Sequence, residues 1–189
     1  MNFIITLSGQ LGSGKSTIGK LLATRLGYTF YSTGNAQRQI AAERGLTTLE
    51  LNKLSMTDTS IDKQIDSIFK ELALKDENFV VDSRLGFFFI PSSLKVKLNV
   101  DTSVAAERIL NDPTRSEEQK YQSIQEAKNA LLERRALEIE RFKTLYHVDI
   151  ENESNFDLII DTTDKSPEKI ADIILEKFQK FQKRRLKNC

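Results

Sequence analysis

The chain has 189 residues, 39% of them apolar and 29% charged, a balance typical of one globular domain that buries its own core. Its 28 Lys and Arg residues against 27 Asp and Glu residues leave a formal charge of +1, so net charge gives no reason to expect a nucleic-acid or membrane partner. One cysteine, Cys189, and one histidine, His147, provide neither a disulfide framework nor a zinc cluster, and we expect a cytoplasmic protein.

The first half of the chain alternates between short apolar runs and amphipathic helices. Residues 3–7 form a continuous β-rich run of the kind found in strands buried on both faces. A helix is expected over 15–26, because its apolar residues fall on one face and Gly27 is a natural stop. Further along we expect a strand at 28–31, a helix over 35–44, no clear element over 46–55, and a helix over 58–75.

The second half continues this alternation to the C-terminal helix. In order we expect a strand at 79–82, a strand at 94–100, helices over 102–110 and 117–145, and a strand at 156–161. The last helix is expected to begin at Ser166, a good N-cap that precedes Pro167 at the first helical position. Strands separated by helices predict a five-stranded parallel sheet covered on both faces, with ligands bound beyond the carboxyl ends of the strands.

Residues Gly9–Ser16 match the pattern G-x-x-x-x-G-K-[ST] in every fixed position, between an expected strand and an expected helix. The glycines let backbone N–H groups converge on phosphate oxygens, and the helix N-terminus adds positive potential. Lys15 is expected to reach the β- and γ-phosphates of ATP, and the Ser16 hydroxyl to bind Mg²⁺. The predicted nucleotide-binding residues are Gly9, Gly12, Ser13, Gly14, Lys15, Ser16 and Thr17, with ATP and Mg²⁺ as cofactors. This motif makes the predicted fold an α/β fold of the P-loop NTPase type, a three-layer α/β/α sandwich.

Polar stretches follow the second and third strands, where acceptor and metal groups of such a fold should lie. The stretch 32–38 reads S-T-G-x-x-x-R, and the stretch 80–84 reads V-V-D-S-R. Together with the phosphate loop and the segment 134–161, these stretches resemble nucleoside monophosphate kinases, most closely the cytidylate kinase-like group. The resemblance covers most of the chain in the expected order.

The resemblance implies a reaction and a domain plan. The reaction is ATP-dependent phosphoryl transfer to a nucleoside monophosphate, with CMP or dCMP preferred, by a monomer or weak homodimer. The chain would form one domain over 1–189, with an acceptor-binding subdomain at 34–76 and a lid at 111–135. Because water must be excluded from phosphoryl transfer, both parts are expected to close over bound substrates.

The resemblance also implies roles for individual residues. The acceptor would be bound by Ser32, Gly34, Arg38 and Arg84, with the two arginines on its phosphate, and Asp82 would lie near the Mg²⁺ bound by Ser16. The catalytic set would be Lys15, Arg84, Arg134 and Arg141, the last two as lid arginines, with Arg115 and Arg135 as further lid candidates.

Two departures from the family pattern lie on the acceptor side. Asn35 stands where many relatives carry an acid, and Ser83 interrupts the more usual D-G-R. In the unusual run Phe87–Phe89, one ring could stack on a base. Three readings therefore stay open: a nucleoside monophosphate kinase, a small-molecule hydroxyl kinase with Asp82 as base, and a nucleotide-binding regulator without turnover.

A structural alternative exists for the lid arginines. Arg134, Glu138 and Arg141 are spaced four and three residues apart, which is also the spacing of an ion-pair ladder on an exposed helix face.

Overall fold

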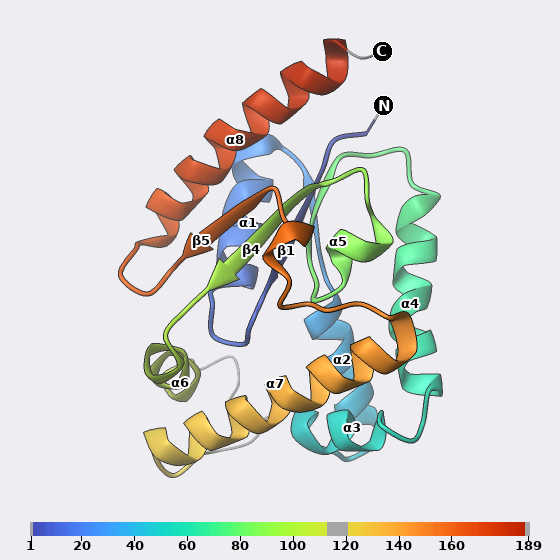
Figure 1. Ribbon diagram of the computed structural model, residues 1–189, viewed down its shortest axis with the longest axis vertical. Coiled ribbons are helices and arrows are strands. Elements are labelled where there is room, and N and C mark those ends of the chain that lie inside the picture. Colours follow the sequence, from blue (N-terminus) through green and yellow to red (C-terminus); the bar gives the residue numbers. More distant parts are fainter. Residues whose placement is uncertain (1, 113–120, 188–189) are drawn as a thin grey trace.

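The computed structural model describes residues 2–112 and 121–187, which fold around one five-stranded sheet with the strand order β2-β3-β1-β4-β5. The strands are β1 (Ile4–Gly9), β2 (Thr29–Ser32), β3 (Phe79–Asp82), β4 (Leu94–Asn99) and β5 (Leu158–Asp161). All four strand pairings are parallel, so every strand ends at the same edge of the sheet (Figure 1). The predicted α/β fold with a five-stranded parallel sheet is confirmed.

Helices cover both faces of this sheet. They are α1 (Lys15–Leu26), α2 (Thr33–Glu43), α3 (Thr48–Leu54), α4 (Ser60–Ala73), α5 (Gly86–Phe89), α6 (Thr102–Leu110), α7 (Ile124–Tyr146), the 3-10 turn η2 (Glu153–Asn155) and α8 (Pro167–Lys187). Helices α1 and α8 pack together on one face, and α4 and α5 pack on the other. Helix α7 crosses the lower part of the molecule in Figure 1, beside α2 and α3.

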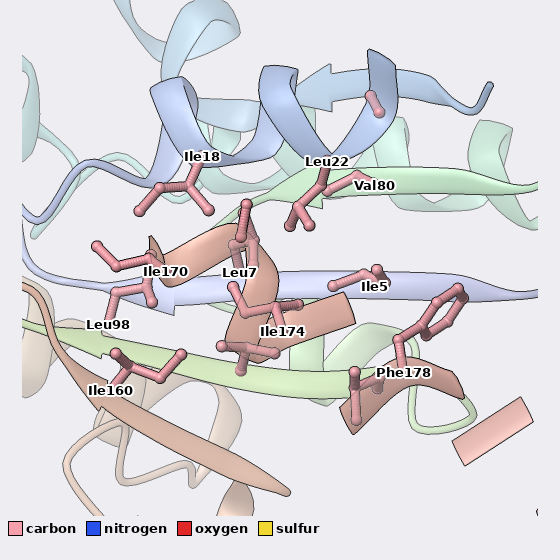
Figure 2. Close-up of a cluster of buried hydrophobic side chains, with 14 residues drawn as sticks. Ile5, Leu7, Ile18, Leu22, Val80, Leu98, Ile160, Ile170, Ile174 and Phe178 are labelled. Atoms are coloured by element: carbon pink, nitrogen blue, oxygen red, sulfur yellow. The ribbon is translucent and has the colours of Figure 1, made fainter. Parts of the chain in front are cut away.

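The main core lies between the sheet and the α1/α8 layer (Figure 2). Ile5 and Leu7 of β1 alternate with residues that point to the opposite face, so both faces of the strand are buried. Helix α8 contributes Ile170, Ile174 and Phe178, which are spaced four residues apart and form one apolar stripe against the strands. This core fixes the sheet edge at which the functional side chains gather.

Most element boundaries differ from the sequence expectation by one or two residues, and three differences have a clear cause. The segment 46–55 contains α3, which begins with a capping box between Thr47 and Glu50. Helix α2 begins at Thr33 because the Ser32 hydroxyl caps it by accepting from the Asn35 backbone N–H. The expected continuous helix over 117–145 is not found, because α7 begins at Ile124 and residues 121–123 before it are not helical. Residues 113–120 of the predicted lid, with Arg115, lie outside the described residues.

The phenylalanine run forms the short helix α5, which was not expected. Phe87 packs against Phe156 at 4.7 Å between ring centroids, and Phe89 stacks on Phe69 at 4.6 Å. These rings therefore cover the sheet face opposite α1. Among the helices of residues 2–112 and 121–187, none is long and apolar enough to cross a membrane.

Candidate functional site

The phosphate loop Gly9–Ser16 joins β1 to α1 through backbone angles that need glycine. Gly9 and Gly12 have φ angles of 137° and 79°. A Cβ on Gly9 would lie 2.1 Å from the Leu98 carbonyl oxygen, and one on Gly12 would lie 2.8 Å from the backbone of Ala105 in α6. The loop therefore packs against β4 and α6 too closely for any side chain, and this packing sets the position of Lys15 at the start of α1.

Four polar side chains meet around this loop. Lys15 is almost fully buried and its Nζ donates to the Gln10 carbonyl oxygen at 2.8 Å. The Ser16 hydroxyl donates to Asp82 Oδ2 at 2.5 Å, and the Ser32 hydroxyl approaches the same oxygen at 3.4 Å. Because β3 pairs with β1, with Asp82 opposite Leu7, the carboxylate at the end of β3 reaches the first turn of α1.

These groups fit the ligands that the motif predicts. Glycine-turned backbone N–H groups, a lysine and the N-terminus of α1 are suited to polyphosphate oxygens. The Ser16 and Asp82 oxygens are hard donors of the kind that Mg²⁺ takes. Among the described residues no group of three His, Cys, Asp or Glu side chains gathers that could hold a metal ion.

A cleft of about 410 Å³ opens next to the loop, and we call it the main cleft. Of the predicted site residues, its lining includes Gly12, Ser13, Gly14, Lys15, Ser16, Thr17, Gly34, Arg38, Asp82, Arg84 and Arg134. Gly9, Ser32 and Arg141 are not part of the lining. The sheet edge thus brings together three arginines from three different segments with the phosphate-loop lysine.

Other residues of the main cleft were not predicted from the sequence. Arg108 of α6 lines it and donates from Nη1 to the Gly12 carbonyl at 3.3 Å and from Nη2 to the Thr162 carbonyl at 2.8 Å. Thr162 and Lys165, which follow β5, also line it. Thr162 and Lys165 follow the end of a strand, and this position could have indicated that they belong to the site. Arg108 gives no such signal, because basic residues are common in the last turn of a helix.

One buried carboxylate holds two of the cleft arginines. Glu138 Oε2 accepts from Arg84 Nε at 2.7 Å, and its Oε1 accepts from Arg134 Nε at 3.0 Å. Burial favours the neutral acid, but the two guanidinium charges outweigh it and lower the pKa of Glu138 from 4.5 to about 2. The pKa of Arg84 is raised: burial opposes its charge, and the charge of Glu138 more than offsets burial.

Arg141 faces a different space. A second cavity of about 40 Å³ lies between α2, α4 and α7 and is lined by Gln37, Asp62, Asp66, Phe69 and Arg141 among others. Arg141 Nε lies 3.4 Å from Asp62 Oδ1, and its Nη1 donates to Asn52 Oδ1 at 3.0 Å. Arg134, Glu138 and Arg141 are all at least nine-tenths buried, so the alternative of an exposed ion-pair ladder is wrong.

Two acids of the second cavity, Asp62 and Asp66, have pKa values that their surroundings raise. Burial raises the pKa of Asp62, although the nearby Arg141 charge opposes the rise. Burial also raises the pKa of Asp66, which accepts a 2.8 Å hydrogen bond from the Tyr146 hydroxyl. Asp62 Oδ2 and Arg141 Nε are buried without a hydrogen-bond partner among the described residues. Such a pair can serve a ligand that supplies the missing donor and acceptor.

The departures from the family pattern have local structural explanations. Asn35 accepts a hydrogen bond from Arg38, three residues along α2. The Ser83 hydroxyl accepts from the Leu85 backbone N–H at 3.3 Å and so closes the turn after β3. The rings of Phe87, Phe88 and Phe89 are not part of the lining of the main cleft or of the second cavity.

Arg135, a further lid candidate, is bound to Glu151 and Gln10. Its Nη2 pairs with Glu151 at 2.6 Å and its Nη1 donates to Gln10, so it joins α7 to the loop before β5 and to the phosphate loop.

Three comparisons relate this geometry to known proteins. A relative described as an S-adenosylmethionine-dependent nucleotide dehydratase, from Lacinutrix mariniflava, is 38% identical over 177 residues. That match takes in 93% of this chain but 36% of the relative, so the chain spans about a third of that protein's length. A cytidylate kinase from Methanocella arvoryzae is 34% identical over 180 residues, 95% of this chain and 99% of that enzyme.

A solved shikimate kinase from Acinetobacter baumannii, in complex with shikimate, superposes with a TM-score of 0.61 at 18% identity, over 95% of this chain and 94% of that one. At that identity the likeness concerns the fold alone. The family model of the cytidylate kinase-like family matches residues 4–164, which contain the phosphate loop, the cleft arginines and the second cavity. The chain therefore belongs to the cytidylate kinase-like family, and this membership supports nucleotide kinase activity with ATP and, typically, Mg²⁺.

Proposed function

We propose that the chain transfers the γ-phosphoryl group of ATP to a nucleoside monophosphate, with CMP or dCMP as the preferred acceptor. The observation that carries this proposal is the gathering of Lys15 with Arg38, Arg84 and Arg134 in one cleft. Phosphoryl transfer needs in-line positioning and neutralisation of negative charge more than it needs covalent chemistry from the protein. These four cations, with Arg108 and Lys165 in the same lining, suit a reaction between two phosphate-bearing substrates.

The cleft residues divide by segment. Lys15 and the phosphate loop bind the ATP phosphates, and Ser16 with Asp82 would hold Mg²⁺, which when bound neutralises charge on the β- and γ-phosphates. Arg38 and Arg84 bind the acceptor phosphate through their guanidinium forks, with Ser32 and Gly34 shaping the start of α2. Arg134 of α7 stabilises the transferring group.

No general base is needed for this acceptor. A monophosphate is already an anion at pH 7, so its oxygen can attack without losing a proton to the protein. A hydroxyl acceptor would need a base. Asp82 is the candidate, but its Oδ2 already accepts from Ser16, which favours a metal-site role. A monophosphate therefore fits this cleft better than the hydroxyl acceptor of a small-molecule kinase.

The preference for cytosine rests on the second cavity. Cytosine presents an amino donor at N4 beside an acceptor at N3, and carboxylates accept from cytosine N4. Asp62 Oδ2 and Arg141 Nε make no hydrogen bond among the described residues, and the two side chains form an ion pair, with Arg141 Nε 3.4 Å from Asp62 Oδ1. Uracil presents the reverse pattern at these positions and would leave both groups unpaired. We therefore place the base against Asp62 and Arg141, which gives Arg141 a base-binding role instead of a lid role.

Substrate entry requires movement. A cavity of about 40 Å³ has room for water but not for a pyrimidine ring. The segment 34–76, which contains α2, α3 and α4, would move away from α7 to admit the base and then close again. This is the acceptor-binding motion expected for 34–76.

A panel of acceptors tests the proposal. The purified chain is supplied with ATP, Mg²⁺ and, in turn, CMP, dCMP, UMP, AMP, GMP, shikimate and gluconate, and release of ADP is followed. We expect the fastest turnover with CMP or dCMP, and a shift toward UMP in Asp62→Asn, whose amide can donate to uracil O4. ATP binding without turnover on any acceptor would favour the regulator reading, and turnover on a hydroxyl acceptor alone would favour the small-molecule kinase.

A second function follows from the dehydratase relative. Because 93% of this chain matches a third of a protein described as a nucleotide dehydratase, we infer that the phosphorylated product of this kinase can serve such a dehydration. The test joins the chain, CMP and ATP with the rest of the relative, purified without the third that this chain matches, under S-adenosylmethionine-dependent conditions, and mass spectrometry follows the nucleotide. The inference is supported if the nucleotide loses one water with the wild-type chain and does not lose it with Lys15→Ala. Dehydration that proceeds equally without the kinase would contradict it.

A further inference from the structure

Glu138 pairs with two of the cleft arginines, and neither the predicted site nor the comparisons assign it a role. It lies in the middle of α7, one helical turn after Arg134, and its side chain is 5% exposed. Each of its two carboxylate oxygens accepts from the Nε of a different arginine. One oxygen therefore holds a residue that follows β3, and the other holds a residue of α7.

This arrangement orients both guanidinium groups. Within the part of the chain that the structure describes, the Arg84 guanidinium donates one hydrogen bond, from Nε to Glu138, and neither Nη group is used, while the residue lines the main cleft and the second cavity. Arg134 donates from Nη2 to Gln37 Oε1 at 2.8 Å and from Nη1 to Thr48 Oγ1 at 3.2 Å, so its plane is held from three sides. A fork fixed in this way loses less side-chain freedom when phosphate binds.

The Glu138 carboxylate also reduces the repulsion between the positive charges of Arg84 and Arg134. Arg84 and Arg134 are both largely buried and line the same cleft, so without a counter-charge they would repel each other before any phosphate arrives. Glu138 neutralises one of the two charges and stays ionised across the neutral range, because the same two guanidinium groups lower its pKa to about 2. It thus keeps the pair in place in the absence of substrate.

We propose that Glu138 is a positioning residue for phosphoryl transfer, which sets the two arginines across the main cleft and links α7 to the end of β3. The inference rests on the proposed function, because it assigns the arginines to bound phosphate groups. The inference adds that the cleft arginines need a carboxylate of glutamate length, which can accept from the Nε atoms of Arg84 and Arg134 at the same time.

Two variants test that requirement. Glu138→Gln keeps the length but removes the charge, and Glu138→Asp keeps the charge but is one methylene shorter and cannot reach both Nε atoms. We expect kcat to fall about tenfold to a hundredfold in each, the loss that misplacement of reacting groups by about 1 Å produces. The KM for ATP should change little, because the phosphate loop is untouched. All rates are divided by the folded fraction measured by circular dichroism, so loss of folded protein is not counted as loss of turnover.

Glu133→Gln is the matched control. Glu133 lies on the same helix and pairs with Lys53 at 2.8 Å, but the pair is about half exposed and away from the cleft lining. Its kcat should equal that of the wild type. A Glu138→Asp variant with wild-type kcat would overturn the inference, since charge alone would then suffice. If the wild-type protein phosphorylates no monophosphate, the proposed function fails and the inference fails with it; an active wild type with unaffected Glu138 variants refutes the inference alone.

Discussion

The stability of this fold should depend on pH through Glu138, and the dependence can be worked out from its ion pairs. The pKa of Glu138 is about 2 in the folded protein, against an ordinary 4.5. A group whose pKa is lowered on folding contributes stability that is fully present above its unfolded value and is lost as pH falls through its folded value. The relevant window is therefore from pH 4.5 down to about 2.

The magnitude follows from the shift. Each pKa unit corresponds to about 1.4 kcal/mol, so the shift of Glu138 is worth about 3 kcal/mol of unfolding free energy at neutral pH. Glu138→Gln cannot make this contribution and leaves two buried guanidinium groups without their carboxylate. We expect the variant to be less stable than wild type by about 3 kcal/mol at pH 7, and the difference to shrink below pH 4.5.

Urea unfolding followed by circular dichroism at pH 7, 5, 4 and 3 measures the difference directly. The control is again Glu133→Gln, whose exposed pair with Lys53 should change stability by less than about 1 kcal/mol. A difference between wild type and Glu138→Gln that stays constant from pH 7 to pH 3 would refute the reasoning, because it would show that the charge of Glu138 is not what stabilises the fold.

Three further outcomes follow from the site and the core. Lys15→Ala should lower turnover about a hundredfold or more, as loss of a charge-stabilising group does, without unfolding the protein; full activity would contradict the phosphate-loop assignment. Gly12→Ala should weaken ATP binding, measured by calorimetry, and destabilise the fold by roughly 1–3 kcal/mol, because its Cβ would lie 2.8 Å from Ala105 and its φ is 79°. Phe178→Ala removes a fully buried ring and should cost roughly 3–5 kcal/mol in urea unfolding, while kcat per folded molecule stays unchanged because the ring lies in the α8 core and not in the cleft.

The phosphate loop and the sheet could be predicted because their determinants are local. Gly9–Ser16 is contiguous, and each fixed residue type has one physical purpose. The run 79–82 matches β3 residue for residue, since a short apolar run ending in Asp has few alternatives in an alternating chain. The helix α3 cannot be predicted from its periodicity, because it is only seven residues long, although Thr47 and Glu50 have capping-box spacing.

The charged groups of α7 could not be placed from the sequence. Spacing shows that Arg134, Glu138 and Arg141 share a helix face, but an exposed face and a buried polar face have the same spacing. Which face is buried depends on α2, α3 and α4, which contribute Gln37, Asn52 and Asp62 from far away in the sequence. Arg134 and Arg141 line two different cavities only because of contacts with segments distant in the sequence. Their shared helix face alone predicts the same lid role for both.

The contact between α7 and the segment 34–76 consists largely of polar interactions made by Arg134 and Arg141, and their polar character lowers the free-energy cost of opening it. Opening an apolar contact exposes surface to water at a cost of about 25 cal/mol per Å². Opening a contact made of charges and amides returns groups to a solvent that hydrates them well, so the net cost is small. The motion proposed for the segment 34–76 would therefore open and close this contact without exposing a large apolar surface to water. Replacing its charges with well-packed apolar side chains would yield a more rigid protein that admits its acceptor more slowly.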